Sequence, residues 1–184
     1  MPCEFKDLAL GGVTLVVPRV FKDDRGYFLE SYKYSEFAAA GITERFVQEN
    51  HSFSTAHVVR GLHFQLAPKA QGKLVRVVQG SVWDVAVDLR PDSPTFGKWV
   101  AAELSDQNHH QLYLPPWCAH GFCVLSEVAQ VVYKVTDEYS PQHEGGIAWD
   151  DPQLAIDWPE KQPGLSARDQ KWPPFAEVVK RLQS

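Results

Sequence analysis

The sequence predicts a mainly β protein, a sandwich or barrel of short strands with one short helix in its N-terminal half and another at its C-terminus. Three observations support this prediction. Apolar and polar residues alternate in many short segments, turn-forming residues separate these segments at regular intervals, and only two stretches have a helical period. The chain has 184 residues, of which 44% are hydrophobic and 12% aromatic. This composition can bury a sizeable core, and we expect one domain spanning residues 1–184.

Alternation is clearest in residues 81–89, where Asp84, Ala86 and Asp88 fall on one face and three apolar side chains fall on the other. Further segments with strand-like patterns are residues 13–17, 27–32, 73–78, 99–104, 111–114 and 128–135. Turn-forming residues lie between the segments, at residues 11–12, 23–26, 79–80, 90–94 and 105–108. This regular spacing is what predicts a sandwich or barrel.

Two helices interrupt the strands. Ser35 is a candidate N-cap for a short helix that ends at Gly41. Pro173 and Pro174 open a second helix, because proline is well tolerated in the first turn. The apolar residues of this second helix follow the spacing i, i+3, i+4, i+7 and are Phe175, Val178, Val179 and Leu182.

Charge and cysteine content exclude some kinds of protein. The formal net charge is -5, which argues against a nucleic-acid-binding surface. Cys3, Cys118 and Cys123 are odd in number and lack the spacing of metal ligands. The sequence contains neither a signal-peptide pattern nor an apolar run of about 18 residues. We therefore expect a cytoplasmic protein with reduced thiols and no membrane association.

His63 is the most informative residue for chemistry, because its surroundings begin like a metal motif and then depart from it. In metal-binding barrels of the cupin type, a second histidine follows two residues later on the same strand face, but here that residue is Gln65. Residues 116–121 likewise supply a single histidine, His120. Two neutral imidazoles and an amide would bind a divalent transition metal weakly, so we predict no metal site. Histidine titrates near neutrality, and the pattern therefore favours acid–base chemistry.

Eight motifs are spread along the chain between residues 23 and 169: DDRGYF at residues 23–28, RGLHFQ at 60–65, QGKLVR at 71–76, DVAVDLR at 84–90, SPTFG at 93–97, AHGF at 119–122, YK at 133–134 and LSARD at 165–169. In this order they resemble the dTDP-4-dehydrorhamnose 3,5-epimerase family. The resemblance implies a cupin-type jelly-roll barrel, a homodimer, and catalysis without a metal or cofactor. It also implies inversion of carbons 3 and 5 of dTDP-4-keto-6-deoxy-D-glucose, giving dTDP-4-keto-L-rhamnose.

The resemblance implies roles for five residues in this reaction. The C4 carbonyl acidifies the hydrogens on C3 and C5, so the reaction needs a base, a group that stabilises the enolate oxygen, and an acid on the opposite face. His63 would be the base, and Asp169 would orient its ring and favour the imidazolium. Lys73 would lie near the C4 oxygen and Tyr133 would be the acid. His120 would be a further polar contact near the keto group.

The resemblance also implies which residues bind the substrate. The expected diphosphate contacts are arginines, whose guanidinium groups suit phosphate oxygens: Arg25, Arg60 and Arg168, the last in place of a commoner lysine. The expected thymidine and sugar contacts are Phe28, Glu30, Gln48 and Asn50. Tyr139 stands where the family has an aromatic residue that controls the orientation of the sugar. Part of this set would come from the partner subunit of a homodimer.

Two positions depart from simple patterns. Strict alternation places Arg60 on the strand face opposite to His63 and Gln65, although the resemblance brings both Arg60 and His63 into the pocket. Gly61 between them predicts a bulge or local twist that re-aims Arg60. His57 occupies a place where the family pattern predicts glycine, which indicates an altered turn.

Three other functions share most of these features. A C5-only epimerase of an antibiotic deoxysugar pathway would have almost every motif. A 3,4-ketoisomerase also proceeds through an enediol, but we would expect a second histidine at the position of Gln65. A non-catalytic cupin could bind a nucleotide sugar, although the presence of His63, Lys73 and Tyr133 together argues against this.

Overall fold

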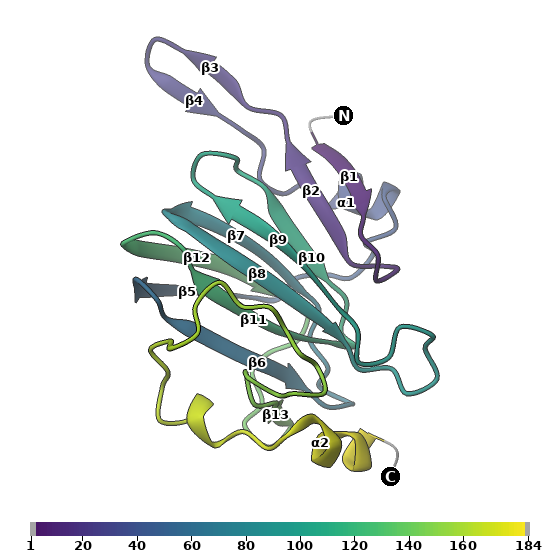
Figure 1. The fold of residues 1–184 in the computed structure, drawn as a ribbon. Helices are drawn as coiled ribbons and strands as arrows, with labels where there is room; N and C mark the ends of the chain where they lie inside the picture. Colours follow the sequence, from purple (N-terminus) through teal and green to yellow (C-terminus); the bar gives the residue numbers. More distant parts are fainter. Residues whose placement is uncertain (1–2, 183–184) are drawn as a thin grey trace.

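Two antiparallel β-sheets face each other in the computed structural model, which describes residues 3–182 (Figure 1). The six-stranded sheet contains, in spatial order, β1 (Cys3–Asp7), β2 (Thr14–Pro18), β10 (Gln111–Leu114), β7 (Lys73–Gln79), β12 (Val128–Val135) and β5 (Gln48–Thr55). The five-stranded sheet contains β13 (Glu144–Gly146), β6 (Val59–Gln65), β11 (Cys118–Val124), β8 (Ser81–Asp88) and β9 (Trp99–Ser105). The remaining elements are the hairpin β3 (Phe21–Asp23) and β4 (Gly26–Phe28), the helices α1 (Tyr34–Ala39) and α2 (Phe175–Leu182), and the 3-10 turn η1 (Asp169–Lys171).

This architecture confirms the predicted mainly β jelly-roll fold. Six of the seven predicted strands are present with ends within one residue of the prediction, as β2, β7, β8, β9, β10 and β12. The prediction for residues 27–32 is wrong beyond Phe28. Strand β4 ends there because its partner in the hairpin, β3, is only three residues long.

The two helices are where the sequence predicts them, but one start differs. Helix α1 begins at Tyr34 and its N-cap is Lys33, which makes no side-chain capping hydrogen bond, so the predicted cap at Ser35 is wrong. The Lys33 ammonium instead pairs with Glu36 in the first turn at 3.2 Å. Helix α2 begins directly after the two prolines, and its apolar side packs against the five-stranded sheet.

The alternation of β8 separates two hydrophobic clusters. Ala86 points between the sheets and packs in a cluster with Val75 of β7 and other buried side chains. Val85 points to the outer face of the five-stranded sheet, in a cluster that includes Phe175 of α2. Both faces of β8 are therefore buried. Asp84 shares the inward face with Ala86, so its carboxylate is also placed between the sheets.

A bulge in β6 re-aims Arg60. His63 pairs with His120 of β11, whereas Arg60 pairs with Phe122, so three steps along β6 match two steps along β11. Gly61 inside the bulge has φ +131°, and a Cβ there would lie 2.6 Å from a backbone carbon of β11. The predicted bulge is thus confirmed, and it allows both Arg60 and His63 to line the space between the sheets.

His57 precedes β6 in a left-handed conformation with φ +63°, which glycine adopts with little strain. Its Nδ1 atom lies 2.7 Å from a carboxylate oxygen of Glu160. The backbone of His57 also accepts a hydrogen bond from Gly164 N at 3.0 Å. The histidine therefore occupies the conformation that the expected glycine would favour, and its side chain adds a contact to the C-terminal segment.

The hairpin β3–β4 projects from the two sheets (Figure 1). Three of its aromatic side chains are exposed, namely Phe21, Tyr27 and Phe28, the last by 65%. Exposed apolar groups gathered on one projecting element are typical of a surface that contacts another molecule.

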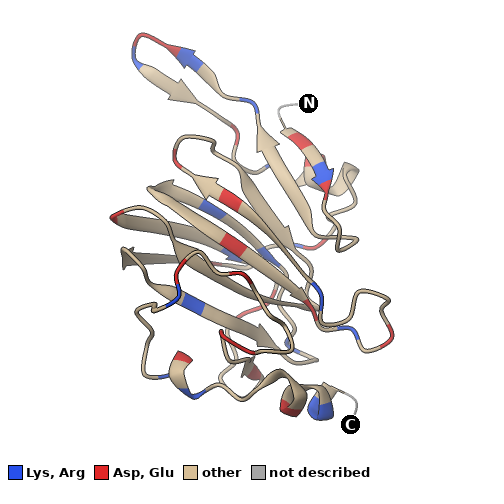
Figure 2. Cartoon of the chain, viewed as in Figure 1, with Lys and Arg blue, Asp and Glu red and all other residues tan. Residues whose placement is uncertain are grey.

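Charged side chains are mixed over the surface. Lys and Arg residues are interspersed with Asp and Glu residues along both sheets and the loops, as Figure 2 shows. Such a mixed surface attracts a polyanion less than a basic stripe does. Within residues 3–182, neither helix has the length and apolar character needed to cross a membrane.

Candidate active site

His63 and Asp169 form a hydrogen-bonded pair that joins β6 to η1. Nε2 of His63 lies 2.6 Å from Oδ1 of Asp169. The carboxylate also accepts hydrogen bonds from Ser166 Oγ at 2.9 Å and from Trp172 Nε1 at 3.2 Å. Burial alone would raise the pKa of Asp169, but the hydrogen bonds from His63, Ser166 and Trp172 lower it overall. An ionised Asp169 thus fixes the orientation of the His63 ring.

Lys73, the first residue of β7, is buried beside His63. Its Nζ donates a hydrogen bond to the backbone oxygen of His63 at 3.3 Å, and the residue is 7% exposed. Burial lowers the pKa of the Lys73 ammonium to about 8, although the nearby Asp84 carboxylate acts in the opposite direction. Lys73 therefore keeps most of its positive charge at neutral pH in surroundings where that charge is poorly screened.

A second histidine–carboxylate pair is buried close to Lys73. Nε2 of His120 lies 2.9 Å from Oδ2 of Asp84, and both side chains are buried. Burial lowers the pKa of His120 despite the opposing effect of Asp84. Sequence reasoning did not select Asp84 as a functional residue. The sequence did contain a sign of this role. A carboxylate that alternates with apolar residues on an interior strand is buried, and a buried carboxylate needs a polar or charged partner.

Tyr133 faces the cavity from β12 of the opposite sheet. Its inward direction follows from the alternation with Val131, which packs in the core between the sheets. Burial raises the pKa of the Tyr133 phenol, and the charge of Arg60 opposes this effect only in part. The phenol is therefore protonated at neutral pH and can donate a proton.

These side chains line two adjoining cavities between the sheets, of about 240 Å³ and about 150 Å³. Both cavities are lined by His63, Lys73, Tyr133 and Arg168. The larger one is also lined by Gln48, Asn50, Phe64, Gln65, Gln71, Tyr139 and Glu144. The smaller one is also lined by Ser52, Arg60, His120 and Phe122. The structure thus brings together all four predicted catalytic residues, with Asp169 behind His63, and six of the nine predicted binding residues.

Glu144 connects two of the predicted binding residues. One of its carboxylate oxygens accepts a hydrogen bond from the Tyr139 hydroxyl at 3.0 Å and another from Arg168 Nη1 at 2.8 Å. Arg60 is held by Ser54, whose Oγ accepts a hydrogen bond from its Nε at 2.9 Å. Sequence reasoning missed Glu144, since one glutamate in a turn-rich segment carries no distinguishing pattern.

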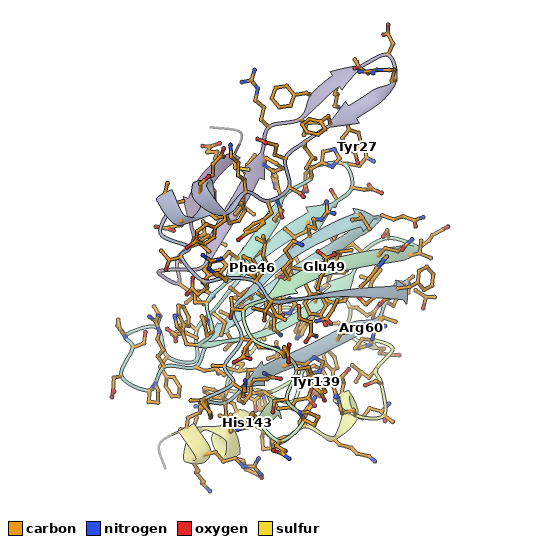
Figure 3. All side chains as sticks on the ribbon, turned by 180° about the vertical axis from the view of Figure 1, so that it is seen from behind. Tyr27, Phe46, Glu49, Arg60, Tyr139 and His143 are labelled. Carbon is orange, nitrogen blue, oxygen red and sulfur yellow. The ribbon has the colours of Figure 1, made fainter. Side chains whose placement is uncertain are left out.

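Three predicted binding residues lie outside these cavities. Arg25 is at the turn of the exposed hairpin and pairs with Asp23 at 2.6 Å. Phe28 lines a different cavity beside the hairpin, and Glu30 follows in the segment that leads to α1. Figure 3 shows Tyr27 of this hairpin well away from Arg60 and Tyr139. Within one chain, the hairpin therefore does not reach the cavity that contains His63.

The donor set at the cavity does not match a common metal site. Gln65 stands where a metal-binding barrel would need a second histidine, and Lys73 adds a cationic side chain to the same cavity. Within residues 3–182, His, Cys, Asp and Glu side chains form no group of three or more that could hold a metal ion. The polar groups at the cavity are instead those of proton transfer and anion binding.

Comparisons with known proteins show the family to which the chain belongs. The sequence profile described as "dTDP-4-dehydrorhamnose 3,5-epimerase" matches residues 7–177. The chain belongs to this epimerase family. A dTDP-4-dehydrorhamnose 3,5-epimerase of Pseudomonas aeruginosa is 53% identical over 173 residues, which are 93% of this chain and 95% of that protein.

Two solved structures of epimerases have the same fold. A dTDP-6-deoxy-D-glucose-3,5-epimerase of Legionella pneumophila, in complex with dTDP-4-keto-L-rhamnose, has a TM-score of 0.94 and 43% identity over 98% of this chain and 96% of its own. A 4-keto-6-deoxy sugar epimerase from the novobiocin biosynthetic gene cluster of Streptomyces spheroides also has a TM-score of 0.94, with 41% identity over 97% and 90%. Membership of the family confirms the predicted enzyme class.

Proposed function

We propose that this chain converts dTDP-4-keto-6-deoxy-D-glucose to dTDP-4-keto-L-rhamnose by inverting carbons 3 and 5 through an enolate, with His63 and Tyr133 as its proton-transfer groups. The observation that carries the proposal is the position of these two side chains on facing sheets, around a cavity that also contains the Lys73 ammonium. A base on one face and an acid on the other are what inversion at a carbon next to a carbonyl requires.

The proposed first step is removal of a proton by His63. The C4 carbonyl acidifies the hydrogens on C3 and C5, and the neutral imidazole accepts one of them. Asp169 then stabilises the imidazolium, because its carboxylate already lies 2.6 Å from Nε2. The hydrogen bonds from Ser166 and Trp172 hold that carboxylate in place.

The negative charge that develops on the C4 oxygen is stabilised by Lys73 in this mechanism. A preorganised donor aimed at such an oxygen contributes about 3 kcal/mol in other enzymes. Asp84 keeps Lys73 cationic, since its carboxylate opposes the lowering of the Lys73 pKa by burial. Tyr133 then donates its phenolic proton to the carbon from the other face, which completes the inversion and leaves a phenolate in the same cavity as the His63 imidazolium. Proton exchange with solvent restores both groups before the second carbon is inverted.

The nucleotide part of the substrate is bound by charge in this proposal. Arg60 and Arg168 lie at the cavity and would contact the diphosphate, as bidentate guanidinium groups often do. Arg25, Phe28 and Glu30 would be supplied by the partner subunit of a homodimer. The exposure of the aromatic side chains on the hairpin supports this arrangement, because a partner would cover them.

We further propose that the protein acts in the cytoplasm and needs no metal or cofactor. Cys3, Cys118 and Cys123 are all free thiols, which suits a reducing compartment. The base, the cation and the acid are all side chains of this chain, and solvent restores the protonation states of the base and the acid between the two inversions.

Labelling in deuterated water tests the proposed function directly. Each inversion breaks one C–H bond and reforms it from the opposite face, so product formed in deuterated water should carry deuterium at both C3 and C5. Mass spectrometry and NMR of the sugar would locate the label. A C5-only epimerase would label C5 alone, and a protein that only binds the nucleotide sugar would label neither carbon above the background without enzyme.

The pKa of Lys73 predicts how activity depends on pH. Above a pH of about 8 the Lys73 ammonium loses its proton, so kcat/KM should fall as the pH rises through this value. A Lys73→Arg variant keeps its charge at this pH, so its profile should lack that fall even if its maximal activity is lower. An identical alkaline fall in both enzymes would show that a different group titrates.

A further inference from the structure

Gln65 stands where a metal-binding barrel would have its second histidine, and its amide is used in a different way. The residue is the last of β6 and is only 5% exposed. Its Nε2 donates hydrogen bonds to the backbone oxygens of Lys69 at 2.6 Å and Glu138 at 3.3 Å. Its Oε1 accepts a hydrogen bond from Ser140 N at 2.7 Å. Both amide hydrogens and one lone pair are therefore already bonded within the protein.

Two of these bonds flank Tyr139. Gln65 contacts the carbonyl before Tyr139 and the N–H after it, as a neighbouring β-strand would. The backbone N–H of Tyr139 itself donates to Oε1 of Gln48 on β5 at 2.9 Å. The side chains of two glutamines, one from each sheet, thus hold the backbone around Tyr139 from both sides, and the Tyr139 ring forms part of the cavity wall.

We propose that Gln65 is a positioning residue for substrate binding that acts through Tyr139. This inference rests on the proposed function, because it takes the substrate to be the molecule against which the Tyr139 ring is placed. Residues 137–140 follow β12 without regular structure, so side-chain amides supply the hydrogen bonds that a strand partner would otherwise make. The amide geometry suits this task, since a side chain with only donors or only acceptors could not bond both groups.

The test compares Gln65→Glu and Gln65→Met with the wild type. Glutamate keeps the size but loses both donors and places a carboxylate against two carbonyls, and methionine keeps the shape without polar atoms. For each variant, KM should rise about tenfold, the factor that corresponds to the loss of one or two hydrogen bonds. The value of kcat should change much less, because His63, Lys73 and Tyr133 lie on strands. Gln162→Glu makes the same chemical change at an exposed site and should leave both constants unchanged.

A double-mutant cycle separates positioning from direct contact. In a Tyr139→Ala background, adding Gln65→Met should change KM by less than about twofold if Gln65 acts only through Tyr139. An unchanged tenfold effect in that background would overturn the inference and assign Gln65 a contact with the substrate. An equal KM in the wild type and both Gln65 variants would also overturn it.

Two further measurements, both on the wild type, test the role of Gln65 and the proposed function separately. Hydrogen exchange of the wild-type backbone should show protection of the Tyr139 and Ser140 amides, and rapid exchange at both would contradict the inference without any variant. Solvent deuterium incorporation by the wild type tests the proposed function separately. A wild type that labels C3 and C5, combined with Gln65 variants that behave like it, would refute only the role of Gln65.

Discussion

Replacing His63 by alanine should abolish proton abstraction at both C3 and C5. The reason is geometric, since His63 is the imidazole at the cavity that is oriented by a carboxylate from η1 and faces Tyr133 across the sheets. A positioned base contributes about 10²- to 10⁴-fold to a rate, so we expect at least about a thousandfold loss of kcat together with loss of deuterium incorporation at both carbons. Affinity for dTDP should be nearly unchanged, which would show that the fold and the nucleotide site are intact.

Two comparisons sharpen this prediction. Asp169→Asn should leave weak activity, because it disturbs the orientation and charge of the His63 ring without removing the base. His110→Ala, in the turn before β10, changes a histidine that lies outside both cavities and should behave like the wild type. Substantial inversion by the His63→Ala enzyme would show that the base has been assigned to the wrong side chain.

Replacing Tyr133 by phenylalanine should uncouple exchange from inversion. The variant retains His63, which can still remove a proton and return deuterium to the same face. Inversion needs the phenol on the opposite sheet and should slow by about a hundredfold or more, whereas exchange at C5 should persist. The measured ratio of deuterium incorporation to product formation should therefore rise strongly above that of the wild type.

The matched control for this variant is Tyr32→Phe. Tyr32 packs against Phe37 and Phe46 outside the two sheets, so loss of its hydroxyl should alter neither exchange nor inversion. If the Tyr133→Phe enzyme inverts both centres at the wild-type rate, a water molecule or another side chain must deliver the proton.

Local pattern was sufficient to predict six of the eleven strands in the two facing sheets. Strand β12 alternates because one of its faces packs in the core between the sheets. Strand β8 is buried on both faces, and it alternates because Asp84 and Ala86 point between the sheets whereas Val85 and Val87 pack in the outer cluster with Phe175. Helix α2 was equally predictable from the sequence, since two prolines fix its start. The wrong cap at Ser35 and the overlong strand after Phe28 have a common cause. In both places the boundary of the element depends on which groups are close in space, and sequence patterns do not contain that information.

The site was predictable as a set of residues, but its geometry was only partly predictable. The motif around His63 indicated that this histidine would act as a base, and glycine indicated the bulge that turns Arg60 inward. The pairing of Asp84 with His120 depends on the register between β8 and β11 and could not be derived from either strand alone. The same holds for Gln65, whose three partners lie in two loops that meet only in the folded barrel.

The bulge at Gly61 also fixes the distance between two groups that would contact the substrate. Arg60 and His63 lie on one strand, which is bonded to β11 on one side and to β13 on the other, so their spacing is fixed by the backbone. In the proposed complex, the anionic group and the reacting carbons must match this spacing. β6 would then select substrates by the distance between the diphosphate and the sugar. A sugar joined to its nucleotide by one phosphate fewer would be bound with its ring too far from His63 for proton transfer.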